Sequence, residues 1–366
     1  MRIAVFVPSL RGGGAERVML DLAHGFAERG ITTDLVLPQV EGPYLSEVRS
    51  DVRIVNLDAH RVLTSLPGLV RYLRRERPDA LLATLTHANL VALWARRLSG
   101  VPTRVVVREA NTLTQVTRGA GRDRRRLFPF LVRRFYPWAD GIVAVSTGVA
   151  LDLEASSGTS AARMHILPNP VVTPELTSKA AEVLDHPWFG VGEPPVVLGV
   201  GRLSKQKDFA TLIRAFDRVR RERVARLLIL GEGPERTSLE ALIAELGLSD
   251  QVRLPGFAAN PFAYMARAGV FVLSSAWEGM PGALIQAVAC GAPVVATDCE
   301  SGPREVLQGG RYGRLVPVAD PAALAEAIQA TLERPRVPVP REAVERFTRR
   351  AAVSGYLEVL RGGKVD

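Results

Sequence analysis

The sequence predicts an α/β protein with two doubly wound domains, and three observations lead to that prediction. The chain has 366 residues, which is longer than one ordinary domain. Short apolar runs rich in β-branched residues alternate with segments of helical periodicity, which is typical of parallel sheets covered by helices. The alternation then restarts near residue 194, after a stretch over 168–195 that contains Pro, Gly and Ser.

The first half opens with a predicted buried strand over 2–10, because this segment is apolar and β-branched. A glycine-rich segment follows, then a helix over 17–30 that ends at Gly30, and a strand over 32–40. Connections of this kind give parallel strands with helices between them. The further strands are predicted at 53–57, 80–85, 104–109 and 141–146, and the further helices at 66–78 and 89–100.

The second half repeats this pattern, beginning with a strand over 194–203 and a helix over 209–222. The tail over 341–362 is predicted to be helical, and it could pack back on the first domain. The remaining strands are predicted at 225–233, 251–257, 270–275, 292–297 and 313–318, with a helix at 236–248. We therefore place an N-terminal domain at 1–172, joined by the helix at about 345–366, and a C-terminal domain at 173–344.

Composition sets limits on the compartment and on the partners. The two cysteines are too few for a disulfide scaffold, so a reducing, cytoplasmic compartment is expected. No apolar run approaches the ~20 residues of a membrane-spanning helix, and the first run is broken too early, at Pro8, for a signal peptide. No cysteine or histidine cluster indicates a metal site. The net charge of +9 favours an anionic partner, either nucleic acid, acidic lipid or a phosphorylated substrate.

The segment from Glu278 to Glu305 is the most informative motif. It reads as a carboxylate, a Gly-Met-Pro-Gly turn, a helix, a strand and a second turn. A helix N-terminus offers N–H groups and a positive dipole end to an anion, and a carboxylate beside it can hold hydroxyl groups. These features indicate a pocket for a ligand with both phosphate and sugar, such as a nucleotide sugar. The alternative is that the Glu278 carboxylate only interacts favourably with the dipole at the helix N-terminus. Gln286 would then be an ordinary helix residue.

Two loops that follow strands have residues suited to phosphate. Arg202 and Lys207 lie between a strand and a helix, where two cations suit a diphosphate, although they could also be exposed surface charges. The glycines of the segment 11–17 allow close approach to a ligand at the carboxyl end of the first strand. That segment does not match GxGxxG, so a purely structural turn is the alternative.

The segment 117–140 contains seven arginines and only one acidic residue before Asp140, with aromatic residues interleaved. It could be a basic amphipathic helix for a membrane surface or a phosphorylated lipid. No nucleic-acid recognition motif accompanies it, and a solvated helix with an aromatic core face is the alternative. His24 and His87 are isolated, and a structural role is expected for both.

In their order along the chain, these motifs resemble those of the retaining glycosyltransferases of family 4, which have the GT-B fold. The resemblance extends over almost the whole length of the chain. It implies a nucleotide-sugar donor between two Rossmann-like domains, retention at the anomeric carbon and no obligatory metal or other cofactor. The matching segments are GGGAERVMLDLA, AVSTGVALDL, ILPNPV, GRLSKQKDFATLIRAF, LILGEGPERTSLEALIAELGL, RLPGF and SSAWEGMPGALIQAVACGAPVVATDCESGPREVL.

The resemblance also implies roles for individual residues. Arg202 and Lys207 match the family's diphosphate clamp and Glu278 its sugar-contacting carboxylate, so these three are the predicted catalytic residues. Gly13 and Gly14 match a loop that approaches the donor phosphates. The other donor-binding positions implied are Gly256, Gly279, Met280, Pro281, Gly282, Ala283, Leu284 and Gln286.

Two positions depart from the family pattern. Gln286 stands where the family has a second glutamate for the ribose hydroxyls. An amide can still accept and donate hydrogen bonds, but it binds a hydroxyl less strongly than a carboxylate does. Asn111 lies near the position of a catalytic histidine in several relatives, and it could orient hydroxyls without acting as a base.

The basic segment and the sequence SGPRE look like those of enzymes that extend polyprenyl-diphosphate-linked oligosaccharides with UDP-activated N-acetylhexosamines or galactose. In such enzymes a basic helix contacts the lipid diphosphate and the membrane. This implies a glycan or polyprenyl-diphosphate-linked acceptor, an anionic membrane surface at the inner face of the plasma membrane, and no nucleic acid. The acceptor-binding residues implied are Arg108, Glu109, Asn111, Arg118, Arg122, Arg124, Arg125 and Arg126.

The sequence therefore predicts a retaining transferase that moves a hexose or N-acetylhexosamine from a UDP-sugar to a lipid-linked or growing glycan in cell-surface glycan biosynthesis. Two alternatives stay open. One is a GT-B-fold nucleotide-sugar epimerase or phosphorylase. The other is a catalytically silent subunit that binds sugar nucleotides, which the departures at Gln286 and Asn111 would allow.

Overall fold

The computed structural model describes residues 1–118, 124–337 and 339–363, without the side chains of Arg124 and Arg125. It divides into two compact units, Met1–Val171 with Phe347–Asp366 (unit 1) and Val172–Arg346 (unit 2). Each unit has its own parallel sheet with helices on both faces, which confirms the predicted fold class. The boundary predicted after residue 172 lies one residue from the division after Val171.

The sheet of unit 1 has seven strands in the order β3-β2-β1-β4-β5-β6-β7. The strands pair in parallel, with Ile3 of β1 aligned with Thr33 of β2 and with Ala80 of β4. Strands β1 and β4, in the middle of the sheet, are mainly apolar and buried, as expected for strands that helices cover on both faces. The strands are β1 Arg2–Phe6, β2 Thr32–Leu37, β3 Val52–Asn56, β4 Ala80–Thr84, β5 Arg104–Glu109, β6 Gly141–Ala144 and β7 Met164–Ile166.

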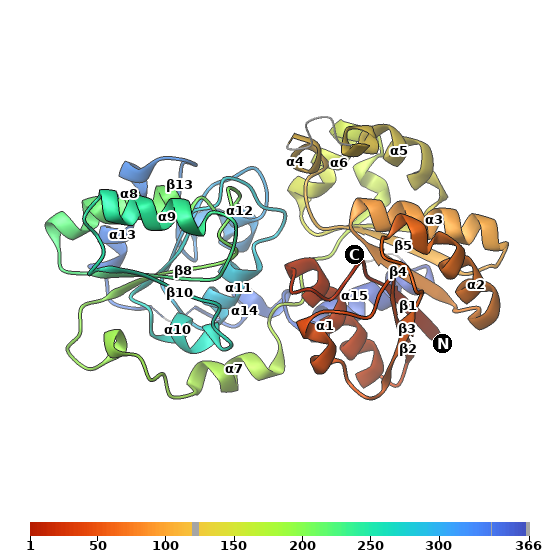
Figure 1. Cartoon of the computed structure of the whole chain (residues 1–366), viewed down its shortest axis with the longest axis horizontal. Helices are drawn as coiled ribbons and strands as arrows, with labels where there is room; N and C mark the ends of the chain where they lie inside the picture. The colour runs from red at the N-terminus through yellow and green to blue at the C-terminus, as the bar shows by residue number, and fades with distance from the viewer. Residues whose placement is uncertain (119–123, 338, 364–366) are drawn as a thin grey trace. The chain divides into compact units, whose positions relative to one another are not determined.

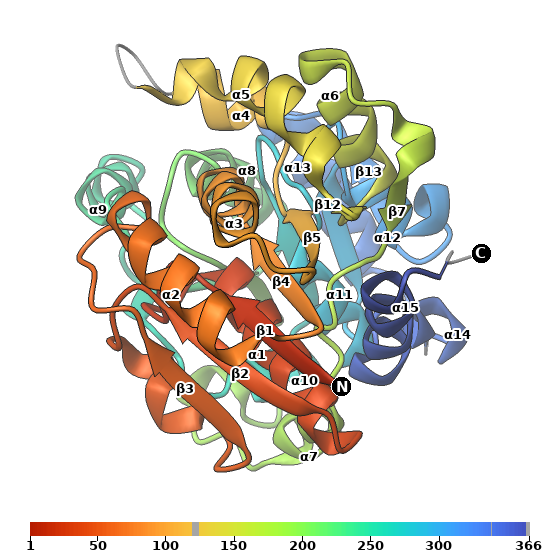
Figure 2. The same cartoon turned by 90° about the vertical axis from the view of Figure 1, so that its right-hand side faces the viewer.

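The helices of unit 1 form a layer on each side of this sheet. Figure 2 shows α2 and α3 beside each other, and α3 also packs on α5. Helices α1 and α15 pack together against the other face. The helices are α1 Gly14–Glu28, α2 Leu66–Glu76, α3 Thr86–Ser99, α4 Leu113–Arg118, α5 Phe128–Phe135, α6 Thr147–Ser157 and α15 Arg349–Arg361, with 3-10 turns η1 Pro43–Glu47, η2 Leu63–Ser65, η3 Arg124–Leu127, η4 Tyr136–Trp138 and η5 Ala161–Arg163.

The tail over 341–362, which was predicted to be helical, contains two helices. Helix α14, Glu342–Glu345, ends before α15 begins, and Thr348 is the N-cap of α15. The Thr348 hydroxyl accepts a hydrogen bond from the Ala351 N–H at 3.2 Å, which satisfies a donor that would otherwise lack a partner. The break lies at the chain's return from unit 2 to unit 1.

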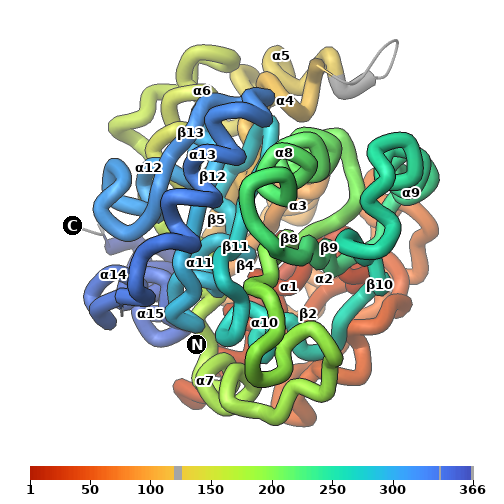
Figure 3. The backbone as a smooth tube through the Cα atoms, turned by 90° about the vertical axis from the view of Figure 1, so that its left-hand side faces the viewer, coloured from red at the N-terminus to blue at the C-terminus, as the bar shows by residue number. Residues whose placement is uncertain are grey.

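The sheet of unit 2 has six strands in the order β10-β9-β8-β11-β12-β13, also parallel. Helix α8 packs on α13, and α10 packs on α7 and α11 (Figure 3). The strands are β8 Val196–Val200, β9 Arg226–Leu230, β10 Val252–Gly256, β11 Val270–Leu273, β12 Val294–Thr297 and β13 Arg314–Val316. The helices are α7 Pro174–Ala181, α8 Phe209–Glu222, α9 Arg236–Glu245, α10 Pro261–Arg267, α11 Gly282–Ala289, α12 Pro303–Val306, α13 Pro321–Leu332 and α14, with 3-10 turns η6 Pro187–Phe189 and η7 Gln308–Gly310.

In both units the ends of parallel strands position the predicted site residues. Lys207 lies in the loop between β8 and α8, and Glu278 follows β11, the neighbour of β8 in the sheet. Parallel α/β sheets bind ligands at this carboxyl edge. Among the described residues, no helix is both long enough and apolar enough to cross a membrane.

Candidate functional site

Lys207 and Glu278 form an ion pair at the carboxyl edge of the unit 2 sheet. Lys207 Nζ lies 2.6 Å from Glu278 Oε1, and the Ser275 hydroxyl donates to the same oxygen at 2.7 Å. The Glu278 side chain is 6% exposed and that of Lys207 is 18% exposed. The pair is therefore largely shielded from water, where a charge–charge interaction is stronger than on the surface. Both contacts use Oε1, which leaves Glu278 Oε2 to accept from a further donor.

The backbone around this pair is held by hydrogen bonds between the two loops. The Ser274 hydroxyl donates to the Lys207 carbonyl at 2.8 Å, and the Ala276 N–H donates to the Gln206 carbonyl at 2.8 Å. The aliphatic part of Lys207 lies across Gly201, where an added Cβ would stand 3.2 Å from Lys207 Cε. Glycine at 201 therefore leaves room for the lysine side chain to reach Glu278.

The Gly-Met-Pro-Gly turn is fixed by the second turn of the same motif. The Ser301 hydroxyl donates to the Gly279 carbonyl at 2.9 Å. Gly302 has a positive φ of 95°, and a Cβ there would lie 2.5 Å from Pro281 Cδ. Only glycine fits this close approach without strain. The two turns of the motif from Glu278 to Glu305 are therefore in contact.

Helix α11 begins at Gly282 without a side-chain cap, since its N-cap residue is Pro281. The N–H groups of the first helical turn are thus available to an anion, as the sequence predicted. Gln286 lies in this helix, is partly exposed, and its side-chain amide has no hydrogen-bond partner in the described part of the chain. The donor-binding positions from Gly279 to Leu284 lie between Glu278 and the first turn of α11.

Arg202 is exposed and, within the described ranges, forms no ion pair. Its loop is packed against the loop after β9, where two glycines make the contact possible. A Cβ at Gly231 would lie 2.0 Å from the Gly201 carbonyl oxygen, and one at Gly233 would lie 2.2 Å from that of Leu203. Gly231 and Gly233 were not among the site residues predicted from the sequence, although Gly-Glu-Gly directly after a strand is a usable signal.

Gly256 ends β10 with a positive φ of 93°, and a Cβ there would meet Glu232 Oε1 at 2.7 Å. Glu232 is itself paired with Arg236 at 2.7 Å. The positive φ of Gly256 and the nearby Glu232 carboxylate both account for glycine at this position. Its predicted contact with the donor stays a prediction.

The glycine-rich loop in unit 1 contains an internal carboxylate. Glu16 Oε2 accepts hydrogen bonds from the N–H groups of Gly12 and Gly13, each at 2.9 Å, and Glu16 Oε1 accepts one from the Ser9 hydroxyl. The Gly13 N–H is therefore already paired within the loop. A Cβ at Gly14 would meet nothing within 4 Å, so packing in the protein does not require glycine there. This position leaves room for close approach of a ligand, whereas Gly13 would have to give up the Glu16 contact to bind phosphate.

The predicted acceptor residues Arg108 and Glu109 lie inside unit 1. Arg108 is fully buried and donates to the Tyr356 hydroxyl and the Thr84 hydroxyl, both at 2.9 Å. Glu109 is 3% exposed, and its carboxylate accepts hydrogen bonds from Tyr136, Asn89 and Thr86. Burial raises the pKa of Glu109 to about 6. The buried hydrogen-bond partners of Arg108 and Glu109 favour a structural role for both residues. Their direct contact with an acceptor stays a prediction.

The other predicted acceptor residues differ in how far the structure describes them. Asn111 is partly exposed, and Arg118 and Arg126 are exposed. Arg122 lies outside the described residues, as do the side chains of Arg124 and Arg125. Both cysteines are at least partly buried, and burial raises the pKa of Cys290 and of Cys299 to about 12. Their thiols therefore stay protonated at neutral pH.

Two family descriptions match most of the chain. Residues 194–334 match the family description "Glycosyl transferases group 1", and residues 13–170 match "Glycosyl transferase 4-like domain". The fold of the UDP-glucose complex of Anabaena Alr3699/HepE is similar, with a TM-score of 0.81, 20% sequence identity and 99% of each chain covered. The fold and the matched domains define the class as that of the GT-B glycosyltransferases.

Two curated relatives are similar over nearly the whole chain. One is the N-acetylgalactosamine-N,N'-diacetylbacillosaminyl-diphospho-undecaprenol 4-alpha-N-acetylgalactosaminyltransferase of Campylobacter jejuni, 31% identical, with 91% of this chain and 90% of the relative covered. The other is the lipopolysaccharide core biosynthesis glycosyltransferase LpsE of Rhizobium meliloti, 30% identical, with 96% of both covered. The chain belongs to the group 1, family 4-like glycosyltransferases.

Proposed function

We propose that the protein is a retaining glycosyltransferase that moves a hexose or N-acetylhexosamine from a UDP-sugar to a lipid-linked or growing glycan. The observation that carries this proposal is the shielded ion pair of Lys207 and Glu278, in which Glu278 belongs to the motif that also contains the uncapped N-terminus of α11. The names of the two relatives, one acting on a diphospho-undecaprenol acceptor and one in lipopolysaccharide core biosynthesis, support a role in cell-surface glycan biosynthesis.

In the proposed reaction, Arg202 and Lys207 bind the donor diphosphate and neutralise the charge that develops on UDP as it leaves. Lys207 Nζ has three N–H donors and gives one to Glu278, so others remain for phosphate oxygens. Glu278 Oε2 accepts a hydrogen bond from a donor-sugar hydroxyl. The N–H groups that begin α11 add further donors for the anion.

Retention follows if the acceptor oxygen bonds to the anomeric carbon on the face from which UDP departs. The bond between that carbon and the phosphate oxygen breaks, and the acceptor proton passes to the leaving phosphate. No side-chain base is needed, which fits asparagine at position 111. The proposal includes no metal, because two cations of the chain neutralise the diphosphate. It also places the protein peripherally on the inner face of the plasma membrane, where a lipid-linked acceptor would be reached.

The test is a mass-spectrometric transfer assay that pairs a panel of UDP-sugars with polyprenyl-diphosphate saccharides, with EDTA present. We expect Lys207→Ala to lower kcat by about 10²–10³-fold, the usual loss when a transition-state charge partner is removed. Lys205→Ala is the matched control, because Lys205 is exposed in the same loop. Thermal unfolding of both variants separates lost chemistry from lost fold, since Lys207→Ala leaves Glu278 buried without its cation.

Near-normal transfer by a folded Lys207→Ala variant would contradict the assigned clamp. Donor hydrolysis or epimerisation without any acceptor would favour a different activity on the same fold. Calorimetric binding of a UDP-sugar with no transfer to any acceptor would instead favour a silent binding subunit.

A further inference from the structure

Ser275 lies beside the ion pair of Lys207 and Glu278 and was not among the site residues predicted from the sequence. It follows β11 at the carboxyl edge of the unit 2 sheet and is 0% exposed. Its hydroxyl donates to Glu278 Oε1 at 2.7 Å, and Lys207 Nζ donates to the same oxygen at 2.6 Å. A hydroxyl has one O–H group, so this hydrogen bond uses the whole donor capacity of the Ser275 side chain.

The backbone of Ser275 is held by the neighbours of β11 on both sides. Its carbonyl accepts a hydrogen bond from the hydroxyl of Thr297, at the end of β12, at 2.6 Å. On the other side, the Ser274 hydroxyl donates to the Lys207 carbonyl, in the loop after β8, at 2.8 Å. Ser274 and Thr297 are both buried. The Ser275 hydroxyl is therefore a donor at a fixed place in the sheet, and it fixes the position of Glu278 Oε1.

The two donors at Oε1 make the two oxygens of Glu278 different. Within the described residues, no side chain donates to Oε2, because Lys207 and Ser275 both contact Oε1. A lysine ammonium is a point charge on a flexible stem, so Lys207 alone could pair with either oxygen. Ser275 donates from a fixed backbone and binds one oxygen only. It therefore keeps the other oxygen, Oε2, for a ligand.

Donor binding would divide Lys207 between two anions. Under the proposed function its ammonium also binds the donor diphosphate, which competes with the Glu278 carboxylate for the same three N–H groups. The Glu278 side chain is only 6% exposed, and a shielded carboxylate that loses its cation is costly. The Ser275 hydroxyl offsets part of this cost, since it keeps a charge-assisted hydrogen bond to Oε1 when the ammonium turns away.

We propose that Ser275 is a positioning residue for the donor sugar, which keeps Glu278 Oε1 occupied so that Oε2 receives a sugar hydroxyl while Lys207 turns to the diphosphate. The inference rests on the proposed function and adds a residue that selects the sugar. Ser275 acts through Glu278 and touches neither the donor nor the acceptor. Its effect is therefore confined to the sugar part of the donor, whereas a purely structural residue would affect the sugar and the nucleotide alike.

Calorimetry on the full chain can separate the two parts of the donor. The probes are UDP alone and whichever of UDP-glucose, UDP-galactose and their N-acetyl forms binds most tightly. We expect Ser275→Ala to weaken binding of the UDP-sugar by about tenfold, the usual effect of losing a hydrogen bond to a charged group. Binding of UDP should change less than about twofold, because UDP has no sugar for Glu278 to contact. Equal effects on both probes, or no effect on either, would overturn the proposal.

Two further variants separate the hydroxyl from its volume and from burial. Ser275→Cys nearly keeps the size of the side chain but has only a weak donor, so it should behave like Ser275→Ala. Ser274→Ala is the matched control, because it removes a buried serine hydroxyl that donates at 2.8 Å to a backbone carbonyl instead. Any loss that it causes should be the same for UDP and the UDP-sugar. Thermal unfolding shows that each variant is folded, and wild-type sugar binding by a folded Ser275→Cys variant would overturn the proposal.

Monodeoxy analogues of the same UDP-sugar test whether Ser275 acts through Glu278. The analogue whose binding Glu278→Gln no longer weakens lacks the hydroxyl that Oε2 contacts. For that analogue, Ser275→Ala should weaken binding by less than about twofold, because the contact that it positions is already absent. A tenfold loss with that analogue, or a loss from Glu278→Gln that is equal for every analogue, would overturn the proposal.

The transfer assay distinguishes this inference from the proposed function. Transfer by the wild-type protein, without a sugar-specific loss in Ser275→Ala, would keep the proposed function and overturn the inference. A sugar-specific loss of binding in Ser275→Ala, with no transfer by the wild-type protein to any acceptor, would keep the inference and overturn the proposed function.

Discussion

Glu109 shows how burial sets the charge state of a single residue. Its carboxylate is hydrogen-bonded to Tyr136, Asn89 and Thr86, yet burial outweighs these contacts and raises its pKa to about 6. The unfolded chain has a glutamate pKa of about 4.3. Between these two values the folded protein binds the proton more tightly than the unfolded chain does. The contribution of Glu109 to stability is therefore greatest below about pH 4.3 and is lost as pH rises to about 6.

We expect Glu109→Gln to remove this pH dependence, which amounts to on the order of 2 kcal/mol in the free energy of unfolding. The amide keeps the shape of the side chain and does not titrate. Hydrogen exchange of the β5 amides between pH 4 and 7 gives the opening free energy of this part of unit 1. If the free energies of the wild-type protein and the Glu109→Gln variant change in parallel across that range, Glu109 is not the titrating group.

The site residues also show what local sequence can and cannot predict. Arg202 and Lys207 could be identified because two cations between a strand and a helix are visible within one short segment. The pairing of Lys207 with Glu278 could not, since the two residues are 71 positions apart and meet only because β8 and β11 are neighbours. The Glu16 contact had a local signal, because an acid three positions after the N-cap is typical of a capping box.

Helix α1 depends on glycine at one position and tolerates other residues at another. A Cβ at Gly25 would lie 2.3 Å from Val353 Cγ2, so glycine there allows α1 and α15 to approach each other. We expect Gly25→Ala to destabilise unit 1 by about 1–3 kcal/mol, the usual cost of overpacking a filled contact. Chemical denaturation, followed by hydrogen exchange in α1 and α15, measures the change.

Gly14→Ala is the matched control in the same helix, since an added Cβ there meets nothing within 4 Å. Alanine at a helical position should leave stability unchanged or raise it by up to about 1 kcal/mol. Under the proposed function it should instead weaken donor use, because the loop could no longer approach the phosphates as closely. A similar loss of stability in both variants would contradict the contact assigned to Gly25.

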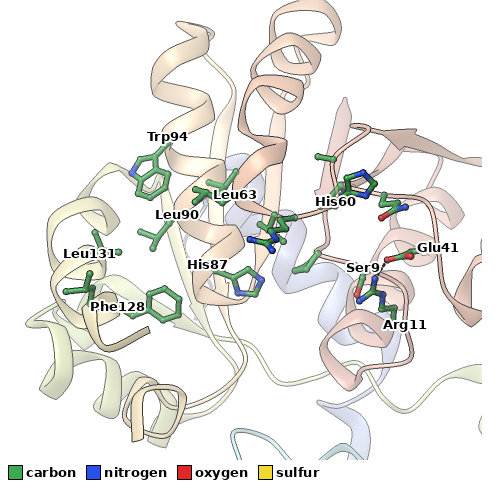
Figure 4. A pocket seen from close by; sticks show the side chains of 18 residues that line it. Ser9, Arg11, Glu41, His60, Leu63, His87, Leu90, Trp94, Phe128 and Leu131 are labelled. Carbon is green, nitrogen blue, oxygen red and sulfur yellow. Dashed lines mark ion pairs between the residues drawn. The ribbon is translucent and has the colours of Figure 1, made fainter. Parts of the chain in front are cut away.

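Element types were predicted better than element boundaries. The strands and most helices have clear apolar periodicity, which accounts for the agreement on fold class. The tail predicted to be helical over 341–362 shows the limit on boundaries, because its second helix begins only after Thr348. A threonine before a helical run is a start signal, and Thr348 stands directly before α15. The cavity of about 550 Å³ in unit 1 (Figure 4) could not be predicted for another reason, since segments after five different strands line it.

The net charge of +9 is a property of the whole chain, and the arginines of the segment 117–140 are one concentrated part of it. Of these, Arg118, Arg126, Arg133 and Arg134 are exposed in the described part of the chain. Arg134 differs, because its guanidinium lies over the rings of Phe135 and Trp138, with centroids 5.4 and 5.6 Å away. Removing Arg134 would disturb packing as well as charge, so it is left unchanged in a test of membrane attraction.

If the segment 117–140 binds the membrane surface, removing three of its charges should weaken the binding of the protein to anionic vesicles. Each arginine near an anionic surface contributes about 1 kcal/mol, so replacing Arg118, Arg126 and Arg133 by Gln should weaken vesicle binding by about 100-fold at low salt. Replacing Arg214, Arg218 and Arg341 of unit 2 removes the same charge from exposed positions outside the segment and is the control.

Sedimentation with vesicles containing anionic lipid, repeated up to about 0.5 M salt, measures the binding of both sets of variants. Because salt screens exposed charges, wild-type binding should fall toward that of the triple variant. Equal losses in the two sets would show that net charge alone attracts the protein to the membrane, and unchanged binding in the first set would exclude the segment from that role.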